Sequence, residues 1–257
     1  MSHCRPAARR GVPFPSPARE QDMSLSGKKI LVVGGSSGMG LATALAAAAQ
    51  GAELVLSSRA QARLDAAAAR FGTPVSTIAA DAADDDAVRA LFARTGPLDH
   101  VVVTAAVVNR KPLAEITLEE AHQAFETKFW TQFNVARRAA PVIRPGGSIT
   151  LFSGISSQRG FASLVVASAI NGAVDALCRS LALALAPVRV NAVSPGFVDT
   201  KSHRDAAREK VLEAVAAGLP LGRVGQPEDL ARAVLFLMES PYSTGSVVVV
   251  DGGHLAG

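Results

Sequence analysis

The chain has 257 residues, of which 49% are hydrophobic and 19% charged, and its formal net charge at pH 7 is +4. That length fits one large α/β domain with a sizeable core. The basic residues are scattered and aromatic residues make up only 5%, so no stacking platform for nucleic acid is indicated. The chain has only two cysteines, and its histidines do not show the spacing of metal ligands, which argues against a metal site.

The N-terminal segment differs from the rest of the chain. It is basic, rich in proline and without helical or strand periodicity, so we expect residues 1–25 to form a disordered tail. A transit peptide is the alternative, although amphipathic spacing and an apolar signal core are both missing. Few cysteines and no signal peptide favour a cytoplasmic protein. No apolar run approaches the length of a transmembrane helix, so no membrane association is expected.

The first predicted unit is a strand, a tight turn and a helix. An apolar run at Ile30–Val33 leads into a glycine-rich turn, and an alanine-rich stretch at Leu41–Gln50 has strong helix propensity. Glycines in such a turn let the backbone approach a pyrophosphate and present helix N–H groups to its charge. The candidate cofactor-binding residues of the turn are Gly34, Ser36, Ser37, Gly38, Met39 and Gly40.

The next predicted strand, Ala52–Leu56, ends close to Ser58 and Arg59. A protein that binds NAD is expected to place a carboxylate here, where it accepts a hydrogen bond from the ribose hydroxyl. A protein that binds NADP instead needs hydroxyls and a guanidinium here for the 2′-phosphate. No acid appears before Asp65, so the sequence favours NADP(H) over NAD(H). The alternative is that Arg59 is only a solvated residue at a helix start.

Two more strands add to the same predicted site. Asp81 and Ala82 follow the strand Val75–Ala79, where they are placed to contact adenine. The strand Asp99–Thr104 ends in small side chains that leave room for a cofactor, and these candidates are Thr104, Ala105 and Ala106.

From about Ser26 to its end the chain resembles the short-chain dehydrogenase/reductase family. The resemblance rests on the glycine-rich turn and on three later motifs, at Arg189–Thr200, Gly225–Ala231 and Thr244–Gly253. It implies a single Rossmann-type doubly wound domain over residues 26–257, and the repeated strand–helix spacing independently favours seven parallel strands covered by helices on both faces. The segment that begins at Met23 resembles a usual family start, which makes Met23 a second candidate for the initiator.

The resemblance also implies which residues bind the nicotinamide end of the cofactor and how the chains assemble. Pro195, Gly196 and Val198 would line the nicotinamide, and Thr200 would bind its carboxamide or a phosphate. Family members usually assemble through two long helices and the last strand. The apolar helix Ala173–Leu185 is compatible with a homo-oligomer, a tetramer or a dimer.

The catalytic positions depart from the family pattern of Asn, Ser, Tyr and Lys. By the same alignment the chain has Lys128, Gly154, Ala167 and Asn171 at these four positions. The single tyrosine is Tyr242, and no lysine lies between Lys128 and residue 201, so the loss of the tyrosine and the lysine does not depend on register. A slip of one or more residues restores a serine through Ser153, Ser156 or Ser157.

The exchange of Asn and Lys suggests a substitute for the missing acid. We hypothesise that Lys128, desolvated between apolar walls, is the acid or base, while Asn171 binds the nicotinamide ribose and Ser153 or Ser156 orients a substrate oxygen. The alternatives are that Lys128 only neutralises a buried carboxylate or fills volume, and that the serines are local caps. His203 is another candidate proton donor.

The substrate is the least constrained part. The resemblance implies an apolar pocket with a basic rim, lined by Val107, Val108, Ile155, Phe161, Leu164, Phe197 and the segment 201–221. A small hydrophobic carbonyl or its alcohol would suit such a pocket. Two interpretations stay open: an NADP(H)-dependent oxidoreductase with a nonstandard proton relay, or an NADP-binding redox-neutral enzyme or regulatory protein without hydride transfer.

Overall fold

A computed structural model describes residues 24–104, 110–200 and 206–257, without the side chains of residues 206 and 207. It contains the predicted parallel sheet of seven strands in the order β3-β2-β1-β4-β5-β6-β7. The strands are β1 (Lys29–Val33), β2 (Glu53–Ser58), β3 (Ser76–Ala79), β4 (Leu98–Val103), β5 (Ile143–Phe152), β6 (Arg189–Pro195) and β7 (Val247–Val250). The fold class expected from the sequence is confirmed.

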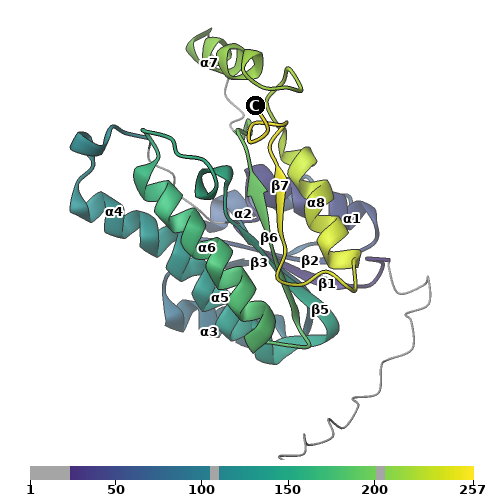
Figure 1. Cartoon of the computed structure of the whole chain (residues 1–257). Helices are drawn as coiled ribbons and strands as arrows, with labels where there is room; N and C mark the ends of the chain where they lie inside the picture. Colours follow the sequence, from purple (N-terminus) through teal and green to yellow (C-terminus); the bar gives the residue numbers. More distant parts are fainter. Residues whose placement is uncertain (1–23, 105–109, 201–205) are drawn as a thin grey trace, which may run out of the picture.

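Helices cover both faces of the sheet (Figure 1). The helices of the described chain are α1 (Gly38–Ala49), α2 (Gln61–Ala68), α3 (Asp85–Thr95), α4 (Leu118–Phe125), α5 (Thr131–Ala139), α6 (Val165–Ala184), α7 (Ala206–Ala217) and α8 (Pro227–Glu239). Of these, α7 stands away from the sheet (Figure 1). Helices α3, α5 and α6 pack on one face with Val101, Leu151 and Ala192, and α1, α2 and α8 pack on the other with Val32 and Val193. Because both faces are buried, the strands are the near-continuous apolar runs seen in the sequence.

The carboxyl ends of the central strands form the edge that matters for function. The strand order reverses at β1, because β2 and β4 flank it and their chains continue to opposite sides of the sheet. In doubly wound sheets a crevice opens at this reversal, outside the carboxyl ends of the strands. The glycine-rich turn after β1 and Thr104 after β4 both lie there.

The helical segment after Thr117 is not one regular helix. It consists of α4, a π-helical turn at Glu126–Trp130 and α5. The Thr131 hydroxyl donates to the carbonyl of Glu126, 3.1 Å away, in this wider turn. A π turn inside a helix is uncommon and frequently marks a functional position. Lys128 lies at its centre.

Helix α6 corrects an expectation from the sequence. Its 20 residues have a mean hydropathy of 1.3, so by length and composition it is apolar enough to cross a membrane, and the statement that no apolar run approaches that length was wrong. The helix contributes Ile170, Val174 and Cys178 to the core beside the sheet. Packing on the sheet therefore accounts for its apolar face.

The N-terminal boundary is only partly visible. Most of the tail predicted for residues 1–25 lies outside the described residues. Leu25, however, is 1% exposed and packs in the core with Ile30 and Leu54. The packed domain therefore includes Leu25.

Candidate functional site

The turn between β1 and α1 requires its glycines. Gly34 and Gly38 have φ values of 86° and 53°, where side chains are disfavoured. A Cβ at Gly40 would lie 2.4 Å from the Gly34 carbonyl oxygen and 2.5 Å from Oγ1 of Thr104. The Thr104 hydroxyl donates to the carbonyls of Val33 and Gly34, at 3.2 and 3.3 Å, and ties β4 to the turn.

The start of α1 offers an anion site. The helix begins at Gly38, earlier than the alanine-rich stretch suggested, so the last three turn residues form its first turn. No acidic residue lies in that turn, and the Ser37 side chain makes no cap hydrogen bond. Its backbone N–H groups and the positive end of the helix dipole are therefore available to an anion.

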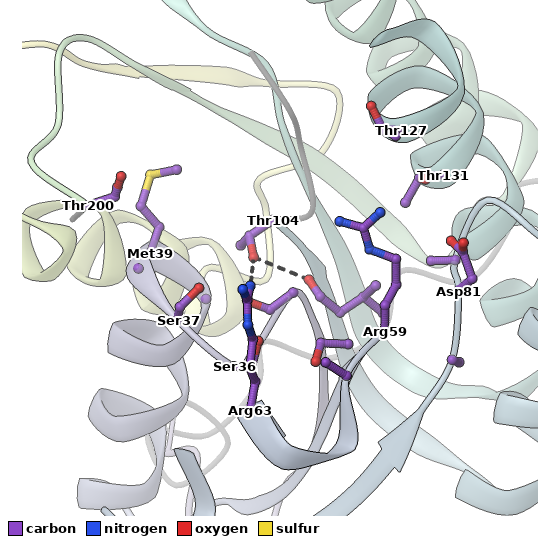
Figure 2. A pocket seen from close by; sticks show the side chains of 18 residues that line it. Ser36, Ser37, Met39, Arg59, Arg63, Asp81, Thr104, Thr127, Thr131 and Thr200 are labelled. Carbon is purple, nitrogen blue, oxygen red and sulfur yellow. Dashed lines mark hydrogen bonds between the residues drawn. The ribbon is translucent and has the colours of Figure 1, made fainter. Parts of the chain in front are cut away.

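A cavity of about 760 Å³ lies over this turn (Figure 2). Twelve predicted cofactor-binding residues line it: Gly34, Ser36, Ser37, Gly38, Met39, Gly40, Ser58, Arg59, Asp81, Ala82, Thr104 and Thr200. Strand ends and turns far apart in sequence thus meet around one hollow.

The cavity also has lining residues that sequence reasoning missed. They are Val33, Ala60, Arg63, Ala80, Thr127 and Thr131. Arg63 lies in α2, four residues after Arg59, and a second arginine so close to the first was a signal available in the sequence. Thr127 and Thr131 belong to the π turn and its continuation, which no pattern in the sequence indicated. Figure 2 shows both guanidinium groups at the cavity.

Other predicted cofactor residues do not line this cavity. Pro195, Gly196, Val198 and Asn171 lie elsewhere in the described part of the chain, while Ala105 and Ala106 fall outside it. A Cβ at Gly196 would lie 2.7 Å from the Cα of Asp251, so this glycine permits close contact between two chain segments.

A second polar cluster lies at the end of β5. Lys128 is 6% exposed, and its Nζ donates to the carbonyl of Ser153 at 2.7 Å and to Oδ1 of Asn171 at 2.5 Å. Nδ2 of Asn171 in turn donates to Oγ of Ser156 at 2.9 Å. The structure therefore brings together the three residues singled out as catalytic candidates, and the direct bond between Lys128 and Asn171 was not anticipated.

The surroundings change the acidity of Lys128. The pKa of its ammonium falls from 10.5 to about 8, because burial lowers it more than the negative charge of Asp175 raises it. A lysine with such a pKa can exchange a proton near neutral pH, unlike a solvated one.

Two features explain the shape of the cluster. A Cβ at Gly154 would lie 2.6 Å from Nδ2 of Asn171, so the amide of Asn171 occupies the space that a side chain at 154 would need. Ala167, one turn before Asn171 on α6, is buried, whereas Tyr242 is 100% exposed. The hydroxyl of Ser153 is buried and has no hydrogen-bond partner among the described residues.

The remaining candidates add little. His203, Val107 and Val108 lie outside the described residues. Burial raises the pKa of the Cys178 thiol to about 12, so nothing activates it as a nucleophile. Within the described ranges no three His, Cys, Asp or Glu side chains are grouped as metal ligands would be.

Comparison with known proteins assigns the fold to a family. Residues 33–254 match the family model described as enoyl-(acyl carrier protein) reductase. L-xylulose reductase of Mesocricetus auratus is 35% identical, over 91% of this chain and 99% of its own.

Two solved structures share the whole architecture. The MalC reductase/Diels-Alderase of Malbranchea aurantiaca is 29% identical with a TM-score of 0.85, over 93% of this chain and 100% of its own. A small-chain dehydrogenase in complex with NADPH is 33% identical with a TM-score of 0.75, over 90% of this chain and 100% of its own. The chain belongs to the short-chain dehydrogenase/reductase family, a family of oxidoreductases.

Proposed function

We propose that this protein is an NADP(H)-dependent oxidoreductase of small hydrophobic carbonyl or alcohol substrates in which Lys128 takes the place of the family's tyrosine as proton donor. The observation that carries the proposal is the buried ammonium of Lys128, bonded to Asn171 and to the backbone of Ser153. The π turn that carries Lys128 also supplies Thr127 to the cofactor-sized cavity.

The residues around the cavity fit a dinucleotide. Any side chain at Gly40 would collide with the turn. With glycine there, the backbone N–H groups of the turn can approach a pyrophosphate closely. Ser58, Arg59 and Arg63 would hold a 2′-phosphate, and Asp81 and Ala82 would contact adenine. The similar structure that contains NADPH supports the same assignment.

The loop after β6 and Asn171 would hold the nicotinamide end of the cofactor. Pro195, Gly196, Val198 and Thr200 would lie along it, and Asn171 would hold the ribose. Thr200 supports this arrangement because its Cβ would be 3.4 Å from a Cβ at Gly38, which brings the loop after β6 to the glycine turn. Asn171 already uses Oδ1 and one N–H for Lys128 and Ser156, so a second N–H remains for a ribose hydroxyl.

Lys128 would supply the proton of the reduction. When bound, NADPH supplies the hydride to the carbonyl carbon. Two of the three ammonium N–H groups of Lys128 are bound within the protein, which would leave the third for a substrate oxygen. With a pKa of about 8 this ammonium is mostly charged at neutral pH yet gives up its proton more readily than a solvated lysine. The free hydroxyl of Ser153 would orient the same oxygen.

The direct test is NADPH oxidation by the purified protein against hydrophobic ketones, quinones and imines. Lys128→Ala is expected to lower kcat by roughly a hundred- to ten-thousandfold, the usual loss for a positioned general acid. Lys28→Ala, at the opposite edge of the sheet before β1, is the control and should keep full turnover. Full turnover by Lys128→Ala would rule out the proposed relay.

The preference for NADP(H) has its own test. Arg63→Ala and Arg59→Ala should each weaken NADPH binding roughly tenfold or more and leave NADH binding within about twofold, because a guanidinium pairs with the 2′-phosphate alone. Titration of the cofactor by fluorescence measures both constants. Equal losses for the two cofactors would contradict the assignment.

A redox-neutral enzyme is the second candidate, and one observation favours it. The similar structure of MalC is described as a reductase and a Diels-Alderase, so this architecture serves chemistry that needs no proton relay. The truncated Ala167 and the absence of a tyrosine near it would then shape a cavity for a larger substrate. Under this alternative, product forms equally with NADP⁺ or NADPH and no cofactor is consumed.

The setting of the reaction follows from the sequence. We infer a cytoplasmic homo-oligomer that acts on small molecules and has no nucleic-acid or membrane partner. Exposed apolar side chains on α6 and α8, among them Leu183 and Phe236, support self-association.

A further inference from the structure

Asp175 is a buried acid that the proposed reaction does not use. It lies on α6, four residues after Asn171, and is buried on the side of the helix that faces the core. Side chains four residues apart in a helix are neighbours, so its carboxylate lies one turn from the amide that binds Lys128. One carboxylate oxygen, Oδ1, is buried and has no hydrogen-bond partner among the described residues.

Lys128 is a buried charge whose hydrogen bonds go to neutral groups. The two groups that accept hydrogen bonds from its Nζ, the Ser153 carbonyl and the Asn171 amide oxygen, are neutral. A buried ammonium without a counter-charge is costly, and removing one member of a buried ion pair is strongly destabilising. A nearby carboxylate that is itself short of partners would offset that cost.

The other groups around Lys128 do not offer this charge. Within the described ranges, Asp175 on α6 is the charged side chain whose field acts on Lys128, while the residue after β5 contributes the backbone carbonyl of Ser153. The turn after β5 contributes the neutral hydroxyl of Ser156 through Asn171. Arg179, one turn beyond Asp175, is exposed, and no ion pair joins the two among those found in the described part of the chain.

We propose that Asp175 is a positioning residue, the buried counter-charge that keeps the Lys128 ammonium charged and aimed at the substrate. This inference rests on the proposed function, in which Lys128 is the proton donor. It extends the polar cluster by one helical turn, from the end of β5 through Lys128 and Asn171 to Asp175.

The test observes Lys128 itself rather than turnover. The chain has six lysines, so ¹³C labelling of lysine side chains gives a spectrum in which Lys128→Met identifies one signal. In the wild-type protein this signal should titrate near the pKa of about 8. In Asp175→Asn it should titrate lower by about one unit or more, because an opposite charge that favoured the ammonium is gone.

Two further variants sharpen the measurement. Asp175→Glu keeps the charge and should restore most of the shift, whereas Arg179→Gln, which removes a charge from the exposed side of the same helix, should change little. Where substrate is reduced, Asp175→Asn should move the loss of kcat/KM at high pH to lower pH by the same amount. An unchanged titration of Lys128 in Asp175→Asn would overturn the inference.

Folding of the variant is handled separately. If Asp175→Asn fails to fold, the double variant with Lys128→Met should fold, because it no longer buries an unpaired charge. Failure of the double variant as well would show that Asp175 is needed for another reason and would overturn the proposal. If instead Lys128 titrates as expected and no substrate is reduced, the proposed function fails while the pairing of the two charges stands.

Discussion

Gly154, Asn171 and Lys128 depend on one another. The backbone at Gly154 has φ 168°, an extended conformation that any residue adopts, so the glycine is not required by its own geometry. It is required by Asn171, whose Nδ2 lies 2.6 Å from the position of a Cβ at 154. Asn171 is held there by Lys128 on one side and Ser156 on the other. Three residues far apart in the sequence thus form one packed unit.

This dependence predicts the outcome of placing a serine at position 154. Gly154→Ser should lower the free energy of unfolding by about 1–3 kcal/mol, the usual cost of overpacking a buried site. In an Asn171→Ala background the same change should cost much less, because the colliding amide is gone. Urea unfolding of the four proteins of this cycle measures the difference.

Gly160→Ser is the control for that cycle, since a Cβ at Gly160 would meet nothing within 4 Å. An equal cost of Gly154→Ser with and without the Asn171 side chain would show that the two positions are not coupled.

Among the elements, the turn from β1 into α1 depends most on one glycine, Gly40. Gly40→Ala would place a Cβ against the Gly34 carbonyl and the Thr104 hydroxyl, which forces the turn open. We expect NADPH binding to weaken more than tenfold and the protein to lose stability. Calorimetric titration and urea unfolding check the two effects.

Gly172→Ala on α6 is the matched control, because a Cβ there would meet nothing within 4 Å. Alanine in place of glycine inside a helix should stabilise the protein by roughly 0.5–1 kcal/mol. Unchanged NADPH affinity in Gly40→Ala would contradict the steric account of the turn.

The pair β4 and β5 carries a buried histidine with a predictable pH response. Nδ1 of His100 lies 2.9 Å from Oγ of Ser148, and burial lowers the pKa of His100 from 6.5 to about 4. The unfolded chain therefore binds a proton at a higher pH than the folded one. Stability from this group is fully present above pH 6.5 and is lost as the pH falls toward 4, in total on the order of 3 kcal/mol.

Urea unfolding at pH 7 and pH 5 measures this response. His100→Gln should lose part of the difference between the two pH values, whereas His122→Gln, on the exposed side of α4, should keep it. An identical pH dependence in His100→Gln and the unsubstituted protein would remove His100 as its source.

The elements also show where prediction from sequence succeeded and failed. The strands and the glycine turn follow from local rules: apolar runs for buried strands, and glycine where φ is positive or backbones approach. The π turn does not follow from such rules. It is followed by Gln132, whose side chain exchanges hydrogen bonds with both backbone groups of Phe152 on β5, a contact between segments distant in sequence. Thr127, Thr131 and the bond between Lys128 and Asn171 were missed or unforeseen for that reason. Such contacts join residues whose approach no local pattern encodes.

At the scale of the whole molecule, two separate faces expose large apolar side chains. Leu183 on α6 is 84% exposed and Trp130 in the π turn is 44% exposed, while Phe236 on α8 and Val249 on β7 are also exposed. Two such faces predict a homo-oligomer, a dimer through one of them or a tetramer through both. Sedimentation of the purified protein at micromolar concentration should give the mass of two or four chains.

Leu183→Arg and Phe236→Arg should each reduce the assembly at one face, with the exposed Leu113→Arg on the segment before α4 as a control for added charge. A monomer of the unsubstituted protein at micromolar concentration would contradict the prediction.

The whole-molecule fold was the part most accessible from sequence, since the motifs at the glycine turn, at Arg189–Thr200 and near the end of the chain are spread along one topology. The chemistry was less accessible, because the acidity of Lys128 comes from burial by elements distant in sequence.

The transfer of deuterium from NADPH with two deuterium atoms at C4 to a hydrophobic carbonyl in a single turnover is the most direct measurement of the central claim. Mass spectrometry should find one deuterium in the alcohol formed by the unsubstituted protein, and the rate should fall at least a hundredfold in Lys128→Ala but not in Lys28→Ala. Product without deuterium, or an unchanged rate in Lys128→Ala, would contradict an oxidoreductase that uses Lys128 as its acid.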